Sequence, residues 1–249
     1  AYREYCAKVS IDTSAIQYEN DEVMATTMHS TDAAIACCVS PSVMGKEHQY
    51  FGARFSGPKA LLYAVSGGVD EKTRKTVIKG LEPIKGDYLE YDELMEKLDK
   101  VMDWTTKVYV RALNIIHRQH DRYAYESTQM ALLDSHPHRY FATGIAGLAL
   151  VGDMLSAVKY SKVRIVRDED GFPVDYVVEG EQFPTFGNND DRVDSLVTGF
   201  LHDFMERLRK LPTYRNAEIT TSILTITSNI VYGKALGNVF TGSNPEVVG

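Results

Sequence analysis

Long apolar runs and an excess of positive charge are both absent from this 249-residue sequence. No stretch approaches the ~20 consecutive apolar residues that a membrane-spanning helix needs. The net charge is −7 and the sequence pI is about 5.5, which argues against non-specific binding to nucleic acid or to an anionic membrane surface. We therefore expect neither nucleic acid nor a membrane among the partners of this chain.

Sequence motifs for nucleotide phosphates and for metals are missing as well. Neither Gly-x-Gly-x-x-Gly nor Gly-x-x-x-x-Gly-Lys-Ser/Thr occurs. His117 and His120 could share a helix face, but no Glu-x-x-His pattern accompanies them, as a di-iron bundle would require. The acidic run 168–170 lacks the alternating ligand spacing of a calcium loop. We predict no metal site and no cofactor bound by this chain.

Cysteine is scarce, with Cys6, Cys37 and Cys38 making up the whole set. Adjacent cysteines form a poor structural disulfide because the ring closed across one peptide bond is strained, and Cys6 is far away in sequence. Such sparse usage favours a reducing compartment. The pair can consist of two small buried hydrophobic side chains, or the two thiols can work in relay at one site.

The composition that remains is that of an ordinary globular protein, with 44% hydrophobic and 24% charged residues. The length allows one large domain or two small ones. We predict an α/β protein with more helix than strand. The predicted helices cover 58–66, 91–122, 126–133, 144–160 and 190–211; a β-hairpin covers 162–167 and 172–178, and a strand covers 219–232.

Residues 91–122 give the clearest helical pattern. Asp92 and Glu93 place negative charge in the first turn, and basic residues lie near the end, which suits the helix dipole. Apolar and small residues recur at three- and four-residue steps, which predicts one buried stripe. The stripe comprises Leu94, Leu98, Val101, Thr105, Val108, Ala112, Ile115 and Ile116.

The remaining segments give weaker signals. Residues 1–36 show little periodicity, although Asn20-Asp21 could cap a short helix. The apolar run 35–39 before Pro41 indicates a buried strand-like segment or a tight loop. Residues 72–85 read as an exposed loop with a short strand over 76–78.

Arg54 and His48 are the polar residues near the cysteine pair that could take part in chemistry. Arg54 can be a surface or ion-paired residue, or its planar guanidinium can hold a small carboxylate through two hydrogen bonds. His48, ten residues after Cys38, could pair with a thiol, but its context predicts a loop. Phe51 can be plain core or the wall of a pocket.

Several segments, in order over residues 5 to 238, carry a resemblance to one enzyme family. The first are Ile35-Ala36-Cys37-Cys38-Val39-Ser40-Pro41 and Phe51-Gly52-Ala53-Arg54. The other matching segments are 9–14, Gly67-Gly68-Val69-Asp70-Glu71-Lys72, Glu82-Pro83-Ile84-Lys85-Gly86-Asp87, 112–117, Arg167-Asp168-Glu169-Asp170-Gly171 and 224–229. Together these segments resemble the pyruvate formate-lyase (formate C-acetyltransferase) family of glycyl radical enzymes.

The resemblance implies roles for four residues. Cys38 would pass a radical from a stored glycyl radical to Cys37, whose thiyl attacks the keto carbon of pyruvate. Formate then leaves, the acetyl group stays on Cys37, and coenzyme A takes it as co-substrate. Arg54 would hold the carboxylate of pyruvate, and Phe51 would wall the substrate pocket.

The resemblance also implies an architecture and partners. The family fold is an α/β barrel of two half-barrels with a cysteine loop reaching its centre, and residues 1–249 would be a single central piece of it. A radical S-adenosylmethionine activating enzyme would install the radical. A homodimer, or a partner chain carrying the radical glycine, is expected. The compartment would be the cytoplasm, or an organelle, and the pathway anaerobic glucose metabolism.

The sequence departs from the family pattern in what it does not contain. The family has a second carboxylate-binding arginine upstream and a Ser-Gly-Tyr radical loop downstream, whereas no Ser-Gly-Tyr occurs here and the match fades after Asn238. We therefore expect this chain to be inactive alone. The alternatives are a non-catalytic structural or assembly fragment, an inactive paralogue, or a thiol redox protein. Pyruvate and 2-ketobutyrate are not distinguished, because one methylene changes discrimination by only ~1–3 kcal/mol.

Overall fold

The computed structural model describes residues 1–13, 16, 18–36, 40–123, 132–223 and 229–241. The chain divides into two compact units, a smaller one of residues 1–49 with 127–138 and a larger one of residues 50–126 with 139–249. None of the helices in the described ranges combines the length and the apolar character needed to cross a membrane.

In its described residues, the smaller unit contains two helices and a short hairpin. Its elements are α1 (Tyr2–Thr13), α2 (Asp21–Met28), β1 (Ala33–Ala36) and β2 (Ser40–Val43). The side chain of Asn20 accepts a hydrogen bond from the backbone N–H of Val23 at 2.9 Å, so the predicted cap of a short helix is confirmed. Strands β1 and β2 pair antiparallel, with Ala36 opposite Ser40.

Helix α1 was not expected from the sequence. None of its residues is buried, so it has no apolar stripe facing a core. Periodicity reports an amphipathic face, and a helix without such a face gives no periodic signal to detect. This is why residues 1–36 read as irregular.

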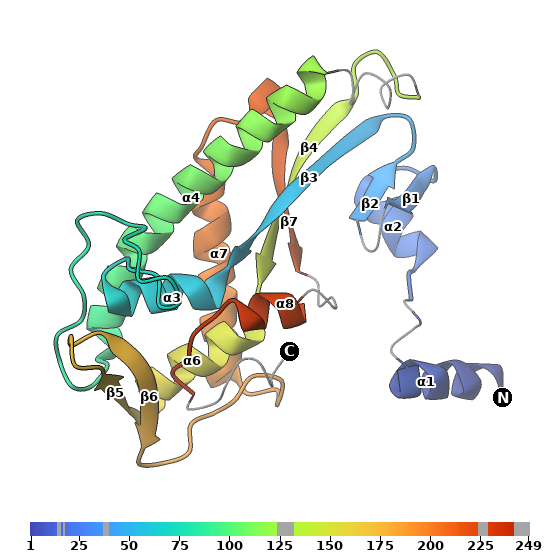
Figure 1. The fold of residues 1–249 in the computed structure, drawn as a ribbon. Helices are drawn as coiled ribbons and strands as arrows, with labels where there is room; N and C mark the ends of the chain where they lie inside the picture. Colours follow the sequence, from blue (N-terminus) through green and yellow to red (C-terminus); the bar gives the residue numbers. More distant parts are fainter. Residues whose placement is uncertain (14–15, 17, 37–39, 124–131, 224–228, 242–249) are drawn as a thin grey trace. The chain divides into compact units, whose positions relative to one another are not determined.

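The larger unit is built on a sheet of three strands (Figure 1). These are β3 (Glu47–Ser56), β4 (His138–Ala146) and β7 (Glu218–Ile223), in the order β3-β4-β7. Strand β4 runs parallel to β7, and the arrow of β3 points the same way. Parallel strands are normally buried on both faces, which agrees with the run of buried residues from Phe141 to Ala146.

The larger unit also contains helices that pack against one another. They are α3 (Gly57–Ser66), α4 (Tyr91–Arg122), α6 (Leu148–Tyr160) and α7 (Asp191–Arg209), and α7 contacts β7. A hairpin of β5 (Lys162–Arg167) and β6 (Pro173–Glu179), the 3-10 turn η1 (Tyr214–Asn216) and the short helix α8 (Asn229–Lys234) complete the described elements. The predictions of helices at 58–66, 91–122 and 190–211 and of the hairpin are thus confirmed.

The predicted helix over 144–160 begins too early. Strand β4 continues through Ala146, and α6 starts only at Leu148. Gly147 makes the turn between them with φ of 79°, and a Cβ there would lie 2.6 Å from Cδ of Pro58. Gly147 therefore allows a tight strand-to-helix turn and a close approach to α3.

Two strand predictions also need correction. Within the predicted strand over 219–232, residues 219–223 belong to β7, residues 224–228 lie outside the described residues, and 229–234 forms helix α8, because strand propensity depends strongly on context. Over 76–78 there is a single bridge between Val69 and Thr76 rather than a strand. Most of the predicted helix 126–133 lies outside the described residues.

The residues that α4 buries in its second half differ from those of the predicted stripe. Leu94 and Val101 are fully buried, whereas Val108 and Ile115 are 45% and 54% exposed. These four residues repeat every seven positions, and a straight α-helix drifts by about 20° per heptad away from such a repeat. The second half of the helix therefore buries another set, namely Thr106, Tyr109, Val110, Leu113 and His117.

Candidate active site

Strand β3 carries the predicted carboxylate anchor, Arg54, and its backbone neighbours are held on both sides. Arg54 is partly buried. On one side, the carbonyl of Ala53 accepts a hydrogen bond from the hydroxyl of Tyr109 at 2.5 Å. On the other, the ring of Phe55 stacks on Phe204 of α7, with centroids 4.7 Å apart and an interplanar angle of 13°. These contacts fix the segment from which the guanidinium extends.

Arg54 lines a small pocket of about 130 Å³ at the end of β3. Since one water occupies roughly 30 Å³ in the liquid, the pocket has the size of a few waters or a small organic acid. Arg54 and Lys59 bring two cationic side chains to its lining. The other lining residues are Phe55, Ser56, Ala146, Tyr232, Ala235 and Leu236.

A larger groove of about 720 Å³ adjoins this pocket and shares Ser56, Ala146, Tyr232 and Leu236 with it. The groove lies where β3 and β4 end and where α3 and α6 begin, and its volume falls within the range of ligand pockets. Ligands of open parallel sheets bind beyond the carboxyl ends of the strands. Arg54 therefore lies at the edge of the sheet where such a site is expected.

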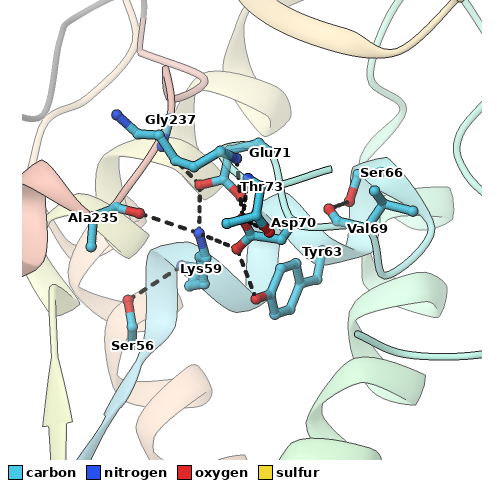
Figure 2. A network of polar contacts seen from close by, with 11 residues as sticks. Ser56, Lys59, Tyr63, Ser66, Val69, Asp70, Glu71, Thr73, Ala235 and Gly237 are labelled. Carbon is cyan, nitrogen blue, oxygen red and sulfur yellow. Dashed lines mark hydrogen bonds and ion pairs between the residues drawn. The ribbon is translucent and has the colours of Figure 1, made fainter. Parts of the chain in front are cut away.

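A polar network holds the wall of the small pocket in place (Figure 2). The ammonium of Lys59 lies 2.8 Å from carboxylate oxygens of both Asp70 and Glu71 and donates to the carbonyl of Ala235 at 3.2 Å. Glu71 in turn accepts from the backbone N–H of Gly237 at 2.8 Å. The network thus ties the start of α3 to residues 235–237, which follow α8.

The charge state of Asp70 depends on this network. Burial by itself raises the pKa of Asp70, but hydrogen bonds from Lys59 and Thr73 outweigh it and hold the pKa well below its usual value of 3.8. Burial, together with the nearby Asp70 carboxylate, raises the pKa of Tyr63, whose hydroxyl donates to Asp70 at 3.2 Å. Asp70 is therefore ionised at neutral pH and forms an ion pair with Lys59.

Replacing Lys59 by Met is expected to lower stability by roughly 2–4 kcal/mol. Asp70 and Glu71 have side chains only 13% and 11% exposed, and the substitution leaves their two negative charges together without a cation. The midpoint of thermal unfolding, measured by calorimetry, is the readout. The control is Lys100→Met, because Lys100 and Glu96 are 54% and 68% exposed and an exposed ion pair contributes little to stability.

The same variant should respond differently to acid. A carboxyl whose pKa is lowered by folding stabilises the fold above its unfolded pKa, near 3.8 for Asp70, and this contribution is lost as the pH falls towards the folded pKa. In Lys59→Met the pKa of Asp70 should rise, so that stability falls less steeply below about pH 4. An unchanged acid profile would contradict the assigned role of Lys59.

The other predicted site residues are placed only in part. Cys37 and Cys38 lie outside the described residues, although Ala36 and Ser40, which flank the segment 37–39, pair with each other. The backbone of Phe51 belongs to β3. His48 also lies on β3 and is 7% exposed, so the loop predicted around it is wrong.

The two histidines of α4 lie in an aromatic cluster of the larger unit. His117 is fully buried, with its ring stacked 4.3 Å from that of Tyr50 and edge-on to Tyr214 at 5.1 Å. His120 contacts the edge of Tyr50 at 5.6 Å. Within the described ranges, no group of three or more His, Cys, Asp or Glu side chains is arranged to hold a metal ion.

Local sequence patterns did not indicate three residues that lie around Arg54, namely Lys59, Tyr109 and Tyr232. The burial of Tyr109 could have been predicted if the apolar stripe along α4 had been drawn with the 3.6-residue period of a helix instead of a seven-residue repeat. The acidic pair Asp70-Glu71 was noted only as part of a family-like segment. Two adjacent carboxylates indicate a basic partner, which is Lys59. Tyr232 gave no signal, because it fell within the predicted strand.

Comparison with known proteins assigns the family. The profile described as "Pyruvate formate lyase-like" matches residues 1–233. Formate acetyltransferase 1 of Escherichia coli (strain K12) is 55% identical over 237 residues, which is 95% of this chain and 31% of the relative. The PFL-like enzyme TdcE of the same organism is 53% identical over 238 residues, with 96% and 31% covered. The chain spans just under a third of the length of these relatives.

Solved structures share the fold at low sequence identity. The glycerol-bound B12-independent glycerol dehydratase from Clostridium butyricum has a TM-score of 0.70 at 20% identity, covering 92% of this chain and 33% of that one. A glycyl radical enzyme from Archaeoglobus fulgidus has a TM-score of 0.59 at 19% identity, covering 82% and 29%. On the strength of the profile match, the chain belongs to the pyruvate formate lyase-like family.

Proposed function

We propose that this chain is the cysteine-bearing part of a formate C-acetyltransferase, which cleaves pyruvate with coenzyme A to give acetyl-CoA and formate. The observation that carries the proposal is 55% identity to Formate acetyltransferase 1 over 95% of the chain. The adjacent Cys37 and Cys38, and Arg54 at a small pocket, supply the groups that this reaction needs.

The four predicted residues divide the reaction among them. The thiol of Cys38 loses its hydrogen atom and then takes one from Cys37, whose thiyl adds to the keto carbon of pyruvate. The bond between the keto and carboxyl carbons breaks and a thioester remains on Cys37. The carboxyl fragment takes the hydrogen atom of the Cys38 thiol and leaves as formate, which returns the radical to Cys38. The thiol of coenzyme A then takes the acetyl group, and its hydrogen restores the thiol of Cys37. Arg54 holds the carboxylate, and Phe51 walls the pocket.

The proposed architecture is a closed barrel. Strands β3 and β7 are the outer strands of the described three-stranded sheet, and unpaired strand edges are normally covered or paired. Further strands from the rest of a longer polypeptide would close this sheet into the family's α/β barrel of two half-barrels. Residues 1–249 then form one central piece of the barrel, with the cysteine loop reaching its centre.

The proposed reaction depends on groups outside this chain. A glycine outside this sequence, on the same polypeptide or on a partner chain, stores the radical, and a radical S-adenosylmethionine enzyme generates it. Coenzyme A is a co-substrate, the enzyme is a homodimer, and the compartment is the cytoplasm. Pyruvate and 2-ketobutyrate differ by one methylene, which changes discrimination by only ~1–3 kcal/mol, and they are therefore the two substrates to compare.

The test uses the complete polypeptide, activated without oxygen, with coenzyme A and one of three substrates. Pyruvate is expected to give equal amounts of formate and acetyl-CoA, and 2-ketobutyrate the corresponding propionyl thioester at a rate within about 200-fold. Glycerol is included because a glycerol dehydratase shares the fold. Dehydration of glycerol to an aldehyde, with no acyl-CoA formed from either oxo acid, would overturn the proposal.

A further inference from the structure

The hydroxyl of Tyr109 links two neighbouring strands of the central sheet. It donates a hydrogen bond to the carbonyl of Ala53 on β3 at 2.5 Å and accepts one from the backbone N–H of Gly144 on β4 at 3.0 Å. A side-chain hydroxyl from α4 thus joins Ala53 of β3 to Gly144 of β4 through two hydrogen bonds.

This bridge lies next to Arg54. The peptide carbonyl that Tyr109 binds belongs to Ala53, so it is part of the peptide unit joined directly to the nitrogen of Arg54. The ring of Tyr109 also meets Phe204 edge-on at 6.2 Å, and Phe204 stacks on Phe55. Tyr109 and Phe204 together hold the residues on both sides of Arg54.

Tyr109 is suited to a permanent donor role. Its side chain is buried, with 8% of the residue exposed. Burial raises the pKa of its hydroxyl to about 12, despite the opposing effects of the Gly144 hydrogen bond and the positive charge of Arg54. The hydroxyl stays protonated at neutral pH, so it always has a hydrogen to donate to Ala53.

We propose that Tyr109 is a positioning residue that sets the place of Arg54, and through it the binding of the carboxylate of a 2-oxo acid substrate. This inference rests on the proposed function, in which Arg54 binds the carboxylate of the substrate. Tyr109 itself does not touch the substrate. Its contribution should appear in substrate binding, since orientation of an anchoring group governs how well the bound acid is held.

The experiment compares Tyr109→Phe with the unaltered complete enzyme. The substitution keeps the ring and removes the two hydrogen bonds of the hydroxyl. Pyruvate binding, measured by calorimetry on the enzyme before radical activation, should weaken about fivefold to tenfold. In the activated enzyme the KM for pyruvate should rise by a similar factor, whereas the KM for coenzyme A should not change.

Two comparisons separate positioning from a general loss of stability. Tyr214→Phe removes another hydroxyl that is hydrogen-bonded to α4, where it lies 2.7 Å from a carboxylate oxygen of Asp121. This variant should leave pyruvate binding unchanged. In an Arg54→Gln background, Tyr109→Phe should alter the KM for pyruvate less than about twofold, because coupled residues are not additive. Thermal unfolding checks the fold, and Tyr109→Met provides a second variant without the hydroxyl.

The outcomes distinguish this inference from the proposed function. If the unaltered enzyme binds pyruvate and Tyr109→Phe or Tyr109→Met binds it equally well, the positioning role is wrong and the proposed function stands. A tenfold weaker binding that persists in the Arg54→Gln background also overturns the role. If the unaltered enzyme itself does not bind pyruvate, the proposed function fails, and the role of Tyr109 fails with it.

Discussion

Replacing Cys37 by Ser in the complete enzyme is expected to lower acetyl-CoA formation by at least about 10³-fold, as removal of a reacting nucleophile does in other enzymes. The proposed chemistry needs a sulfur radical that adds to the keto carbon and then carries the acetyl group. An O–H bond is considerably stronger than an S–H bond, so the serine hydroxyl does not yield a radical by exchange with a thiyl. Acetyl-CoA and formate are measured after anaerobic activation.

Two further variants assign the roles within the cysteine pair. Cys38→Ser should be equally inactive, because it interrupts transfer of the radical to Cys37, and the glycyl radical should remain detectable by electron paramagnetic resonance in both variants. Cys6→Ser is the matched control, since Cys6 lies on α1 as a free thiol, and it should keep full activity. A Cys37→Ser enzyme that forms acetyl-CoA at the normal rate would exclude the acyl-carrier role.

Arg54→Gln is expected to raise the KM for pyruvate about tenfold to hundredfold, the usual range for losing hydrogen bonds to a charged group. The guanidinium can hold a carboxylate through two parallel hydrogen bonds, and it lines a pocket of about 130 Å³. Arg54→Lys keeps the charge but not the planar fork, so it should recover only part of the loss. The KM is measured for pyruvate and for coenzyme A, and only the first should change.

The control for Arg54 is another arginine with well-defined contacts. Arg74 forms an ion pair with Asp168 at 2.8 Å and stacks on Phe172 at 3.8 Å, away from the pocket lining. Arg74→Gln should leave both KM values unchanged. Equal effects of Arg54→Gln on the KM values for pyruvate and coenzyme A would indicate a general disturbance of the fold and contradict a specific carboxylate contact.

Local sequence patterns were sufficient where an element carries its own signals. The helix over 91–122 was predicted with the bounds that α4 has, because its charges and periodicity agree along the whole length. The hairpin over 162–178 followed from alternation around an Asp-Gly turn, and it appears as β5 and β6. The order of family-like segments also indicated the family, which the profile match to residues 1–233 confirms.

The surroundings of Arg54 could not be predicted in the same way. Strand β3 had no clear pattern, and the residues that support it come from distant parts of the chain. Tyr109 lies 56 positions from Ala53, and Ala235 lies 176 positions from Lys59. A local pattern shows that a tyrosine or lysine is present, but its partner is chosen only when the elements pack.

By itself, the sequence determined the helix-rich α/β class, the main helices, the hairpin and the family, because periodicity, capping and turn residues act over a few neighbouring positions. The tertiary structure decided which face of α4 is buried, where β4 gives way to α6, and which side chains hold Arg54. The physical reason is that burial is a property of two surfaces in contact. Val108 and Tyr109 are adjacent in sequence, yet the first is 45% exposed and the second 8%, because only one of them faces the sheet.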